Sequence, residues 1–286
     1  MCKSSTAAGK ACRNVNLHVF LAVTVGHNFP TTQNRGEVTV TDMAPIVIGG
    51  NGHSGTRVFN EILTRGGVFT GFRHLTKRPE SEDLRIIGLL NRWVRPYVYG
   101  ELTSAQVVEM KSDFTRRLRL YFPFRKRPWG FKNPRTMLIL PLLNEMFPDL
   151  KFIHVIRDGR DISLGNPFAT GNPYVDAFLF DDERRLPAAA KMILFWGRSN
   201  EKVHDFGQTH MRGRYLMMRW EDLCDYPDAK SAELLQFASA DAANTKSIAR
   251  IVRRPNSIGR WKTHPGPVRK LVLDHGGHWL KRFQYA

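Results

Sequence analysis

The chain has 286 residues, of which 42% are hydrophobic, enough for a substantial core, so disorder throughout is excluded. Lysine and arginine (43) outnumber aspartate and glutamate (26), and the resulting net charge of +17 favours anionic partners. Cys2, Cys12 and Cys224 are scattered and form no CxxC pair, so neither a disulfide framework nor a zinc site is indicated and a reducing compartment is expected.

Residues 1–42 differ in composition from the rest of the chain. They are rich in Ser, Thr, Asn and Gly, and we expect a disordered N-terminal extension followed by a single domain over residues 43–286. Their apolar stretch, Val15 to Val25, is too short to span a bilayer. Basic residues before this stretch are typical of a signal peptide, but no small-residue cleavage site follows. We therefore expect a cytoplasmic protein, with export left open by the apolar stretch.

The segment from Ala44 to Arg57 predicts a strand, a glycine-rich loop and a helix. Ile46 to Ile48 is a run of β-branched and apolar residues, as in a buried strand of a parallel sheet. The glycines that follow allow backbone N–H groups to converge on an anion at a helix N-terminus. Gly50 and Gly55 have P-loop spacing, but Thr56 stands where an ATP- or GTP-binding loop has lysine. The loop therefore predicts a phosphate site without a nucleoside triphosphate.

Apolar periodicity predicts the next elements. A helix is expected over Thr56–Leu63, ended by Gly66-Gly67, and a short strand over Val68–Gly71. Two amphipathic helices are expected over Leu84–Trp93 and Ser104–Tyr121.

A second candidate site follows in the middle of the chain. Lys132 follows Phe131 and, if Phe131 lies in a strand, emerges at the sheet edge. A helix is expected over Thr136–Phe147, and then an apolar strand delivers Arg157 at its C-terminal end, where ligands collect in open α/β sheets. A guanidinium there can bind a phosphate with two hydrogen bonds. A long helix over Ala188–Phe206 and a buried strand over Tyr215–Met218 complete an α/β prediction with a central parallel sheet.

Together these motifs resemble the sulfotransferases that use 3′-phosphoadenosine-5′-phosphosulfate (PAPS), and most closely the bacterial and Golgi-type members that modify glycans and proteins. The resemblance spans roughly Pro45 to the C-terminus and adds Phe131–Arg135, Tyr215–Leu223 and Ser257–Lys262 to the two sites above. It implies a three-layer α/β/α domain of P-loop-NTPase-like sulfotransferase fold. It also implies PAPS as sulfuryl donor, 3′-phosphoadenosine-5′-phosphate (PAP) as product, and no metal.

The resemblance implies a nucleotide site built from four parts of the chain. The glycine loop would hold the 5′-phosphosulfate, Arg157 the 3′-phosphate and Trp220 the adenine. Ser257–Lys262, called the C-terminal segment below, would close over the nucleotide. The implied nucleotide-binding residues are Gly52, His53, Ser54, Gly55, Thr56, Arg57, Arg157, Ser163, Trp220, Arg254, Gly259, Arg260, Trp261 and Lys262.

Two positions depart from the family pattern. Gly165 stands where a serine usually contacts the 3′-phosphate, which leaves Ser163 as the nearest serine. His53 stands where lysine or arginine is common beside the leaving phosphate, so its charge there would depend on pH near neutrality.

The implied catalytic residues are Glu80, Lys132, His53 and His74. The acceptor's base would come from the polar run after the first helix, with Glu80 as first choice and His74 and Glu82 behind it. The same acidic run also fits an ordinary helix start. Lys132 would face the sulfuryl group and, with His53 and the loop N–H groups, stabilise charge on the departing phosphate.

The acceptor is expected to be a hydroxyl or amine, and a carbohydrate alcohol is suggested by the basic surface and the family resemblance. Asn166–Phe180, rich in Gly, Pro and aromatic residues, is expected to be an acceptor-side loop rather than core. No firm nucleic-acid or membrane signal is present, and the oligomeric state is not indicated. Two other classes remain open: a P-loop kinase or NTPase, and a non-catalytic nucleotide- or nucleic-acid-binding protein, which would explain the charge and the changed His53 and Gly165 positions.

Overall fold

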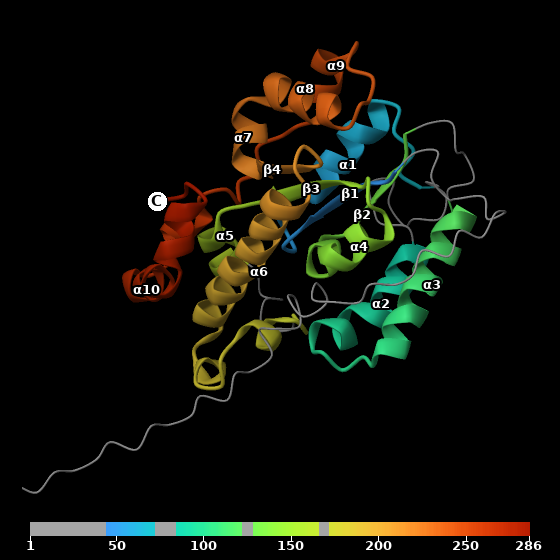
Figure 1. Cartoon of the computed structure of the whole chain (residues 1–286). Helices are drawn as coiled ribbons and strands as arrows, with labels where there is room; N and C mark the ends of the chain where they lie inside the picture. Colours follow the sequence, from blue (N-terminus) through green and yellow to red (C-terminus); the bar gives the residue numbers. More distant parts are fainter. Residues whose placement is uncertain (1–43, 72–83, 122–127, 166–171) are drawn as a thin grey trace, which may run out of the picture.

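The computed structural model describes residues 44–71, 84–121, 128–165 and 172–286. Its centre is a parallel sheet of four strands in the order β2-β1-β3-β4 (Figure 1). The strands are β1 (Ile46–Gly50), β2 (Gly130–Lys132), β3 (Lys151–Ile156) and β4 (Tyr215–Arg219). Because every pairing is parallel, the C-terminal ends of all four strands lie at one edge of the sheet.

Helices connect the strands and cover both faces of the sheet. The α-helices are α1 (Thr56–Arg65), α2 (Leu84–Val98), α3 (Ser104–Tyr121), α4 (Leu140–Met146), α5 (Gly159–Gly165), α6 (Ala188–His210), α7 (Trp220–Asp225), α8 (Pro227–Phe237), α9 (Thr245–Ala249) and α10 (Gly266–Arg282). The 3-10 helices are η3 (Pro134–Ile139), η5 (Val175–Phe178), η6 (Glu183–Arg185) and η7 (Arg260–Thr263).

Successive side chains along each strand point to opposite faces of the sheet, so the core has two halves. Ile48 of β1 and Ile153 of β3 face a core formed with α1, α7, α8 and α9. Val47 and Phe152 face the opposite core, formed with α2, α3, α4, α6 and α10. Figure 1 shows the sheet lying between the two groups of helices. The structure thus confirms the predicted α/β class with a central parallel sheet between helical layers.

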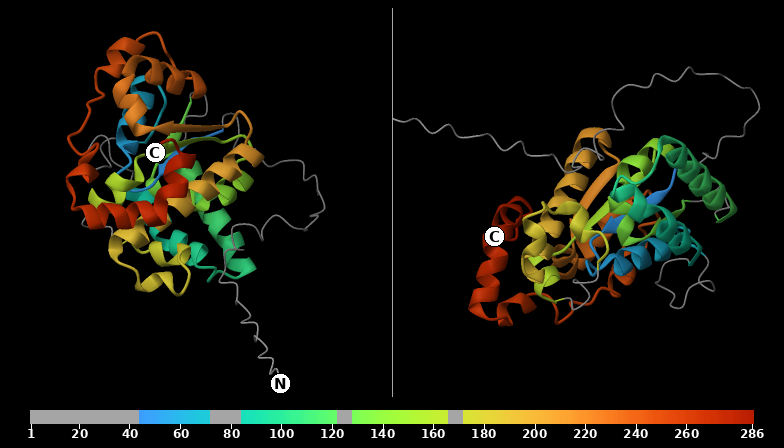
Figure 2. Two further views of the ribbon diagram at one scale, coloured as in Figure 1. Left: turned by 90° about the vertical axis from the view of Figure 1, so that its left-hand side faces the viewer. Right: turned by 90° about the horizontal axis from the view of Figure 1, so that it is seen from below.

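The C-terminal helix α10 packs along α6 at the end of the molecule opposite α2 and α3 (Figure 2). The contact is close because Gly197 of α6 lies directly against the indole ring of Trp279, where a Cβ atom would overlap the ring. In the opposite direction, Gly276 of α10 lies against Ile193. Within the described ranges, no helix combines the length and apolar character that crossing a bilayer requires.

Two predicted elements differ from the structure for local reasons. The expected helix over Thr136–Phe147 is two pieces, η3 and then α4, because Pro141 lacks an N–H group and is tolerated only in the first turn of a new helix. The expected strand over Val68–Gly71 is wrong: only Phe69 forms a bridge, in parallel with Trp129.

Two predictions of burial are also corrected. The strand expected to be buried over Tyr215–Met218 is the edge strand β4, in which only Met218 is fully buried. The part of Asn166–Phe180 that the structure describes, from Asn172 onwards, contributes Tyr174, Val175 and Phe178 to the core instead of forming only a surface loop. Residues 1–43, and with them the expected extension, lie outside the described residues.

Candidate functional site

The loop between β1 and α1 presents unpaired backbone donors at the carboxyl edge of the sheet. Gly55 caps α1 with φ 85°, in the left-handed region, and His53 also has positive φ at 68°. Among the described residues no side chain caps α1, and no acidic residue occupies its first turn. The first N–H groups of an α-helix have no acceptor within the helix and carry partial positive charge. This helix start is therefore suited to an anion.

The loop rests on Trp220, the first residue of α7. A Cβ atom on Gly55 would lie 2.6 Å from Cδ2 of the indole ring, so only glycine fits. Trp220 is buried, and its ring packs on Phe59 of α1 with the centroids 6.2 Å apart. The ring thus supports the loop from the core side, and its predicted contact with an adenine stays a prediction.

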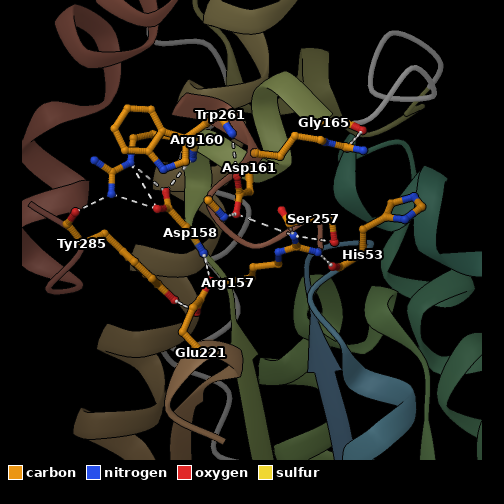
Figure 3. A network of polar contacts seen from close by, with 12 residues as sticks. His53, Arg157, Asp158, Arg160, Asp161, Gly165, Glu221, Ser257, Trp261 and Tyr285 are labelled. Atoms are coloured by element: carbon orange, nitrogen blue, oxygen red, sulfur yellow. Dashed lines mark hydrogen bonds and ion pairs between the residues drawn. The ribbon is translucent and has the colours of Figure 1, made fainter. Parts of the chain in front are cut away.

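Arg157, which follows β3, joins this loop to the C-terminal segment (Figure 3). Its Nη1 donates to the carbonyl oxygen of His53 at 3.1 Å. Its Nη2 donates to the carbonyl oxygen of Ser257 at 2.6 Å and to the Ser257 hydroxyl at 3.0 Å. Arg157 is buried, and its guanidinium therefore contacts the two segments that the sequence predicted to enclose a nucleotide.

Asp161 of α5 anchors the C-terminal segment. One carboxylate oxygen accepts the N–H of Gly259 at 2.7 Å, and the other accepts the N–H of Trp261 at 2.9 Å. The same carboxylate lies 3.6 Å from Nη2 of Arg157. The sequence prediction missed Asp161, although its position four residues after Arg157 at the start of a helix was an available signal.

A second network of hydrogen bonds holds the residues that directly follow Arg157 in the chain. Arg160 donates to both carboxylate oxygens of Asp158, at 2.9 and 2.8 Å, and its guanidinium lies 4.0 Å from the ring centroid of Trp261. Glu221 accepts the N–H of Asp158 at 3.0 Å and the hydroxyl of Tyr285 at 2.9 Å. Burial raises the pKa of the Glu221 carboxyl, against the effect of these hydrogen bonds. The backbone directly after Arg157 is thus held by Glu221.

Three buried polar atoms at this edge have no hydrogen-bond partner among the described residues: the Ser54 hydroxyl, Nε of Arg157 and the Ser163 hydroxyl. A buried polar atom without a partner costs about 1–3 kcal/mol, so such atoms need an explanation where they gather. All three are groups that hydrogen-bond to phosphate oxygens. The residues present therefore fit an anionic, phosphate-bearing ligand.

His53 contacts Arg157 through its backbone, and Figure 3 shows its ring pointing away from that guanidinium. Burial lowers the pKa of His53, and the positive charges of Arg157 and Arg57 lower it further. The imidazole is therefore mainly neutral at neutral pH in the ligand-free protein.

The other predicted site residues lie as follows. Lys132 is buried at the end of β2, opposite Ile48 of β1, so it lies at the same edge as the loop. Arg254 is exposed and paired with Asp225. Arg260 donates to the carbonyl oxygen of Gly165. Among the other predicted positions of the loop and the C-terminal segment, Thr56 is buried, whereas Gly52, Arg57 and Lys262 are exposed.

The predicted bases Glu80 and His74, with Glu82, lie outside the described residues.

A buried polar chain, also missed by the sequence prediction, ties the loop to α6. Nδ2 of Asn200 donates to Oδ1 of Asn51 at 2.7 Å, and Nδ2 of Asn51 donates to the Ser199 hydroxyl at 3.1 Å. Oδ1 of Asn200 lies 2.9 Å from Nε2 of His154 and must accept from it, so Nδ1 of His154 accepts from the Tyr215 hydroxyl at 2.7 Å. A chain of hydrogen bonds with defined donors and acceptors therefore connects the loop to α6 and to strands β3 and β4.

Comparison with known proteins agrees with this geometry. The family described as "Sulfotransferase family" matches residues 45–243, which is more than half of the chain. Among solved structures, sulfotransferase STF9 from Mycobacterium avium is similar, with 14% identity and a TM-score of 0.54 over 85% of this chain and 77% of that one. The sulfotransferase domain of the Synechococcus PCC 7002 olefin synthase matches with 16% identity and a TM-score of 0.49 over 88% and 99%. No curated protein matches the sequence significantly.

The family match begins at Pro45, directly before β1, and so includes the loop between β1 and α1, Lys132, the Arg157 strand and Trp220. A fold of the same kind is found in STF9. The chain belongs to the sulfotransferase family.

Proposed function

We propose that the protein transfers a sulfuryl group from PAPS to a hydroxyl or amine acceptor and releases PAP. The observation that carries this proposal is the pairing of the uncapped start of α1 with the buried Arg157, whose guanidinium lies between the loop and Ser257. A nucleotide with phosphates at both ends requires two such anion sites. The buried hydroxyls of Ser54 and Ser163 supply further donors for phosphate oxygens.

In this proposal the N–H groups at the start of α1 and the Ser54 hydroxyl bind the 5′ end of the nucleotide, and Arg157 binds its 3′-phosphate. Negative charge develops on the 5′-phosphate as the sulfuryl group leaves it, and the helix start, Lys132 and His53 stabilise that charge. The donor, when bound, supplies the sulfuryl group. Asp161 keeps Gly259 and Trp261 over the site by accepting their N–H groups.

Titration calorimetry of PAP without metal tests the nucleotide site. We expect Arg157→Ala to weaken PAP binding by about tenfold to a hundredfold, because hydrogen bonds to charged groups contribute about 1.5–3 kcal/mol. Arg65→Ala is the matched control, since it removes an exposed arginine of α1 that pairs with Glu61. Thermal unfolding of both variants separates lost binding from lost folding.

Mg-ATP is titrated in parallel, because a P-loop kinase or NTPase is the alternative for the same strand, loop and helix. Binding of Mg-ATP without PAP binding, or binding of neither, contradicts the sulfotransferase proposal. PAP binding without transfer to any acceptor favours a non-catalytic nucleotide-binding protein. A carbohydrate acceptor stays a prediction from the basic charge and the family resemblance, and the cavity described below argues for a different acceptor.

A further inference from the structure

A cavity of about 150 Å³ opens beside the first half of the loop. Gly50, Asn51 and Gly52 form one wall, whereas neither Arg157 nor Ser257 lines it. The opposite wall comes from η3, which begins two residues after Lys132. The cavity therefore lies next to the proposed donor site without being part of the Arg157 cluster.

Size and lining restrict what this cavity can hold. An engineered cavity of about 150 Å³ lined by apolar side chains accommodates benzene, so the volume suits a single six-membered ring. Pro134, Met137, Leu138 and Phe195 line it and offer no side-chain hydrogen bonds. A sugar ring would place several hydroxyls against these side chains, and each buried hydroxyl without a partner costs about 1–3 kcal/mol. An aromatic or alicyclic ring fits this lining better.

One cationic side chain lines the cavity. Nη1 of Arg135 donates to Oδ1 of Asn91 at 2.5 Å, and its Nε donates to Oδ1 of Asn133 at 3.3 Å. Both partners are neutral amides, and among the described residues no carboxylate pairs with Arg135. The guanidinium is thus oriented by neutral groups, and no carboxylate of the described ranges compensates its charge. Its remaining N–H groups suit a carboxylate, which guanidinium binds with two parallel hydrogen bonds.

Polar groups at two other points complete the lining. Asn51, held by Asn200 and Ser199, lines the wall that the loop forms. Asn172 and Tyr174 line the cavity from the segment before η5. The cavity thus combines an apolar body, a fixed amide near the donor and a cation at Arg135.

We propose that this cavity is the acceptor site and that it takes a hydroxylated single-ring compound carrying a carboxylate, with Arg135 as the residue that determines this preference. The inference rests on the proposed sulfotransferase function. The acceptor oxygen forms a bond to sulfur while the bond from sulfur to the 5′-phosphate oxygen of PAPS breaks. The acceptor proton passes to a base, and the electron pair of the broken bond stays on the phosphate of PAP. The products are a sulfate ester and PAP.

Three para-substituted phenols of similar size test the charge preference: para-hydroxyphenylpropionate, para-ethylphenol and tyramine, which are anionic, neutral and cationic. We measure PAP release from PAPS with each, and acceptor binding without donor by ligand-observed NMR. The propionate should exceed tyramine in kcat/KM by about tenfold or more, because a hydrogen-bonded charge pair contributes about 1.5–3 kcal/mol. Arg135→Gln should remove that preference in both measurements.

Arg65→Gln is the control, because it removes one positive charge from the surface of α1 outside the cavity and should leave the preference unchanged. Leu138→Phe should block acceptor binding by filling the cavity while PAP still binds. The inference is overturned if tyramine or N-acetylglucosamine is used as well as the propionate, or if Arg135→Gln keeps the preference. If only this inference fails, the unaltered protein still binds PAP. Loss of PAP binding in the unaltered protein instead overturns the proposed function, and this inference with it.

Discussion

Gly55 occupies a backbone conformation and a space that other residues cannot share. Its φ of 85° is left-handed, and an added Cβ would lie 2.6 Å from the rigid ring of Trp220. We expect Gly55→Ala to lower the free energy of unfolding by about 2–4 kcal/mol, from backbone strain together with the overlap. PAP affinity should fall at least about tenfold, because the N–H groups at the start of α1 are displaced. Urea unfolding and calorimetry measure the two effects.

Gly88 provides the matched glycine control. It is exposed in the middle of α2, and an added Cβ would meet no atom within 4 Å. Gly88→Ala should raise the free energy of unfolding by up to about 1 kcal/mol, because glycine is a poor helix former, and should leave PAP affinity unchanged. Equal losses of PAP affinity in the Gly55 and Gly88 variants would contradict the role given to Gly55.

His53 should make nucleotide binding depend on pH. Its pKa is lowered in the ligand-free protein by burial and then by Arg157 and Arg57, and a bound phosphate would raise it again. Binding then takes up a proton, so the contribution of His53 to PAP affinity should grow as the pH falls through the pKa that His53 has in the complex. His53→Asn, which tolerates the left-handed φ of 68°, should lack this gain. Calorimetric titrations between pH 5.5 and 8 compare the two proteins, since protonation of PAP itself affects both equally.

At the scale of elements, α6 holds the loop between β1 and α1 through Asn200. Asn200→Ala would leave Oδ1 of Asn51 and the Nε2–H of His154 without their partner in the core, and we expect a loss of about 2–4 kcal/mol in unfolding free energy. PAP affinity should fall as well, because the loop loses its support. Gln208→Ala, at an exposed position of the same helix, should change stability by no more than about 0.5 kcal/mol. An Asn200 variant as stable as the Gln208 variant would show that the polar chain does not support the loop.

The sequence predicted elements well where periodicity is local. The helix expected over Ser104–Tyr121 is α3, and the expected strand at Ile46–Ile48 lies within β1. The prediction of one helix over Thr136–Phe147 failed because its apolar spacing continues through Pro141, whereas the backbone starts a new helix there. The sequence prediction also failed for Phe69, whose single bridge to Trp129 depends on a residue 60 positions away.

Across the whole molecule, stability should fall in mild acid because of His154. Complete burial lowers the pKa of His154 from 6.5 to about 4. The unfolded chain therefore binds a proton at a pH where the folded protein does not, so stability present above pH 6.5 is lost as the pH falls towards 4, by about 3 kcal/mol. His154→Gln should be less stable at pH 7 but should lack this part of the pH dependence. Urea unfolding at several pH values measures the difference, and parallel curves for both proteins would exclude His154 as the cause.

The motif residues of the candidate site could be predicted from the sequence, but the long-range contacts between them could not. The glycine loop, Lys132 and Arg157 are recognisable because each follows an apolar strand, and parallel strands end at one edge. The contact between Asn51 and Asn200 joins residues 149 positions apart, and Asn200 belongs to no motif. The cavity beside Arg135 is likewise formed by segments that are distant in the sequence and have no shared pattern.

The hydrogen bonds of Arg157 have a thermodynamic consequence for ligand exchange. In the free protein Nη1 and Nη2 of this guanidinium already donate to the carbonyl oxygens of His53 and Ser257, which act as an internal substitute for part of a phosphate, whereas its Nε has no partner among the described residues. A phosphate arriving at Arg157 displaces these oxygens from Nη1 and Nη2 and gains a new hydrogen bond only at Nε. The number of hydrogen bonds then changes little, so the heat released at this arginine is small and the displaced main chain favours release of the product.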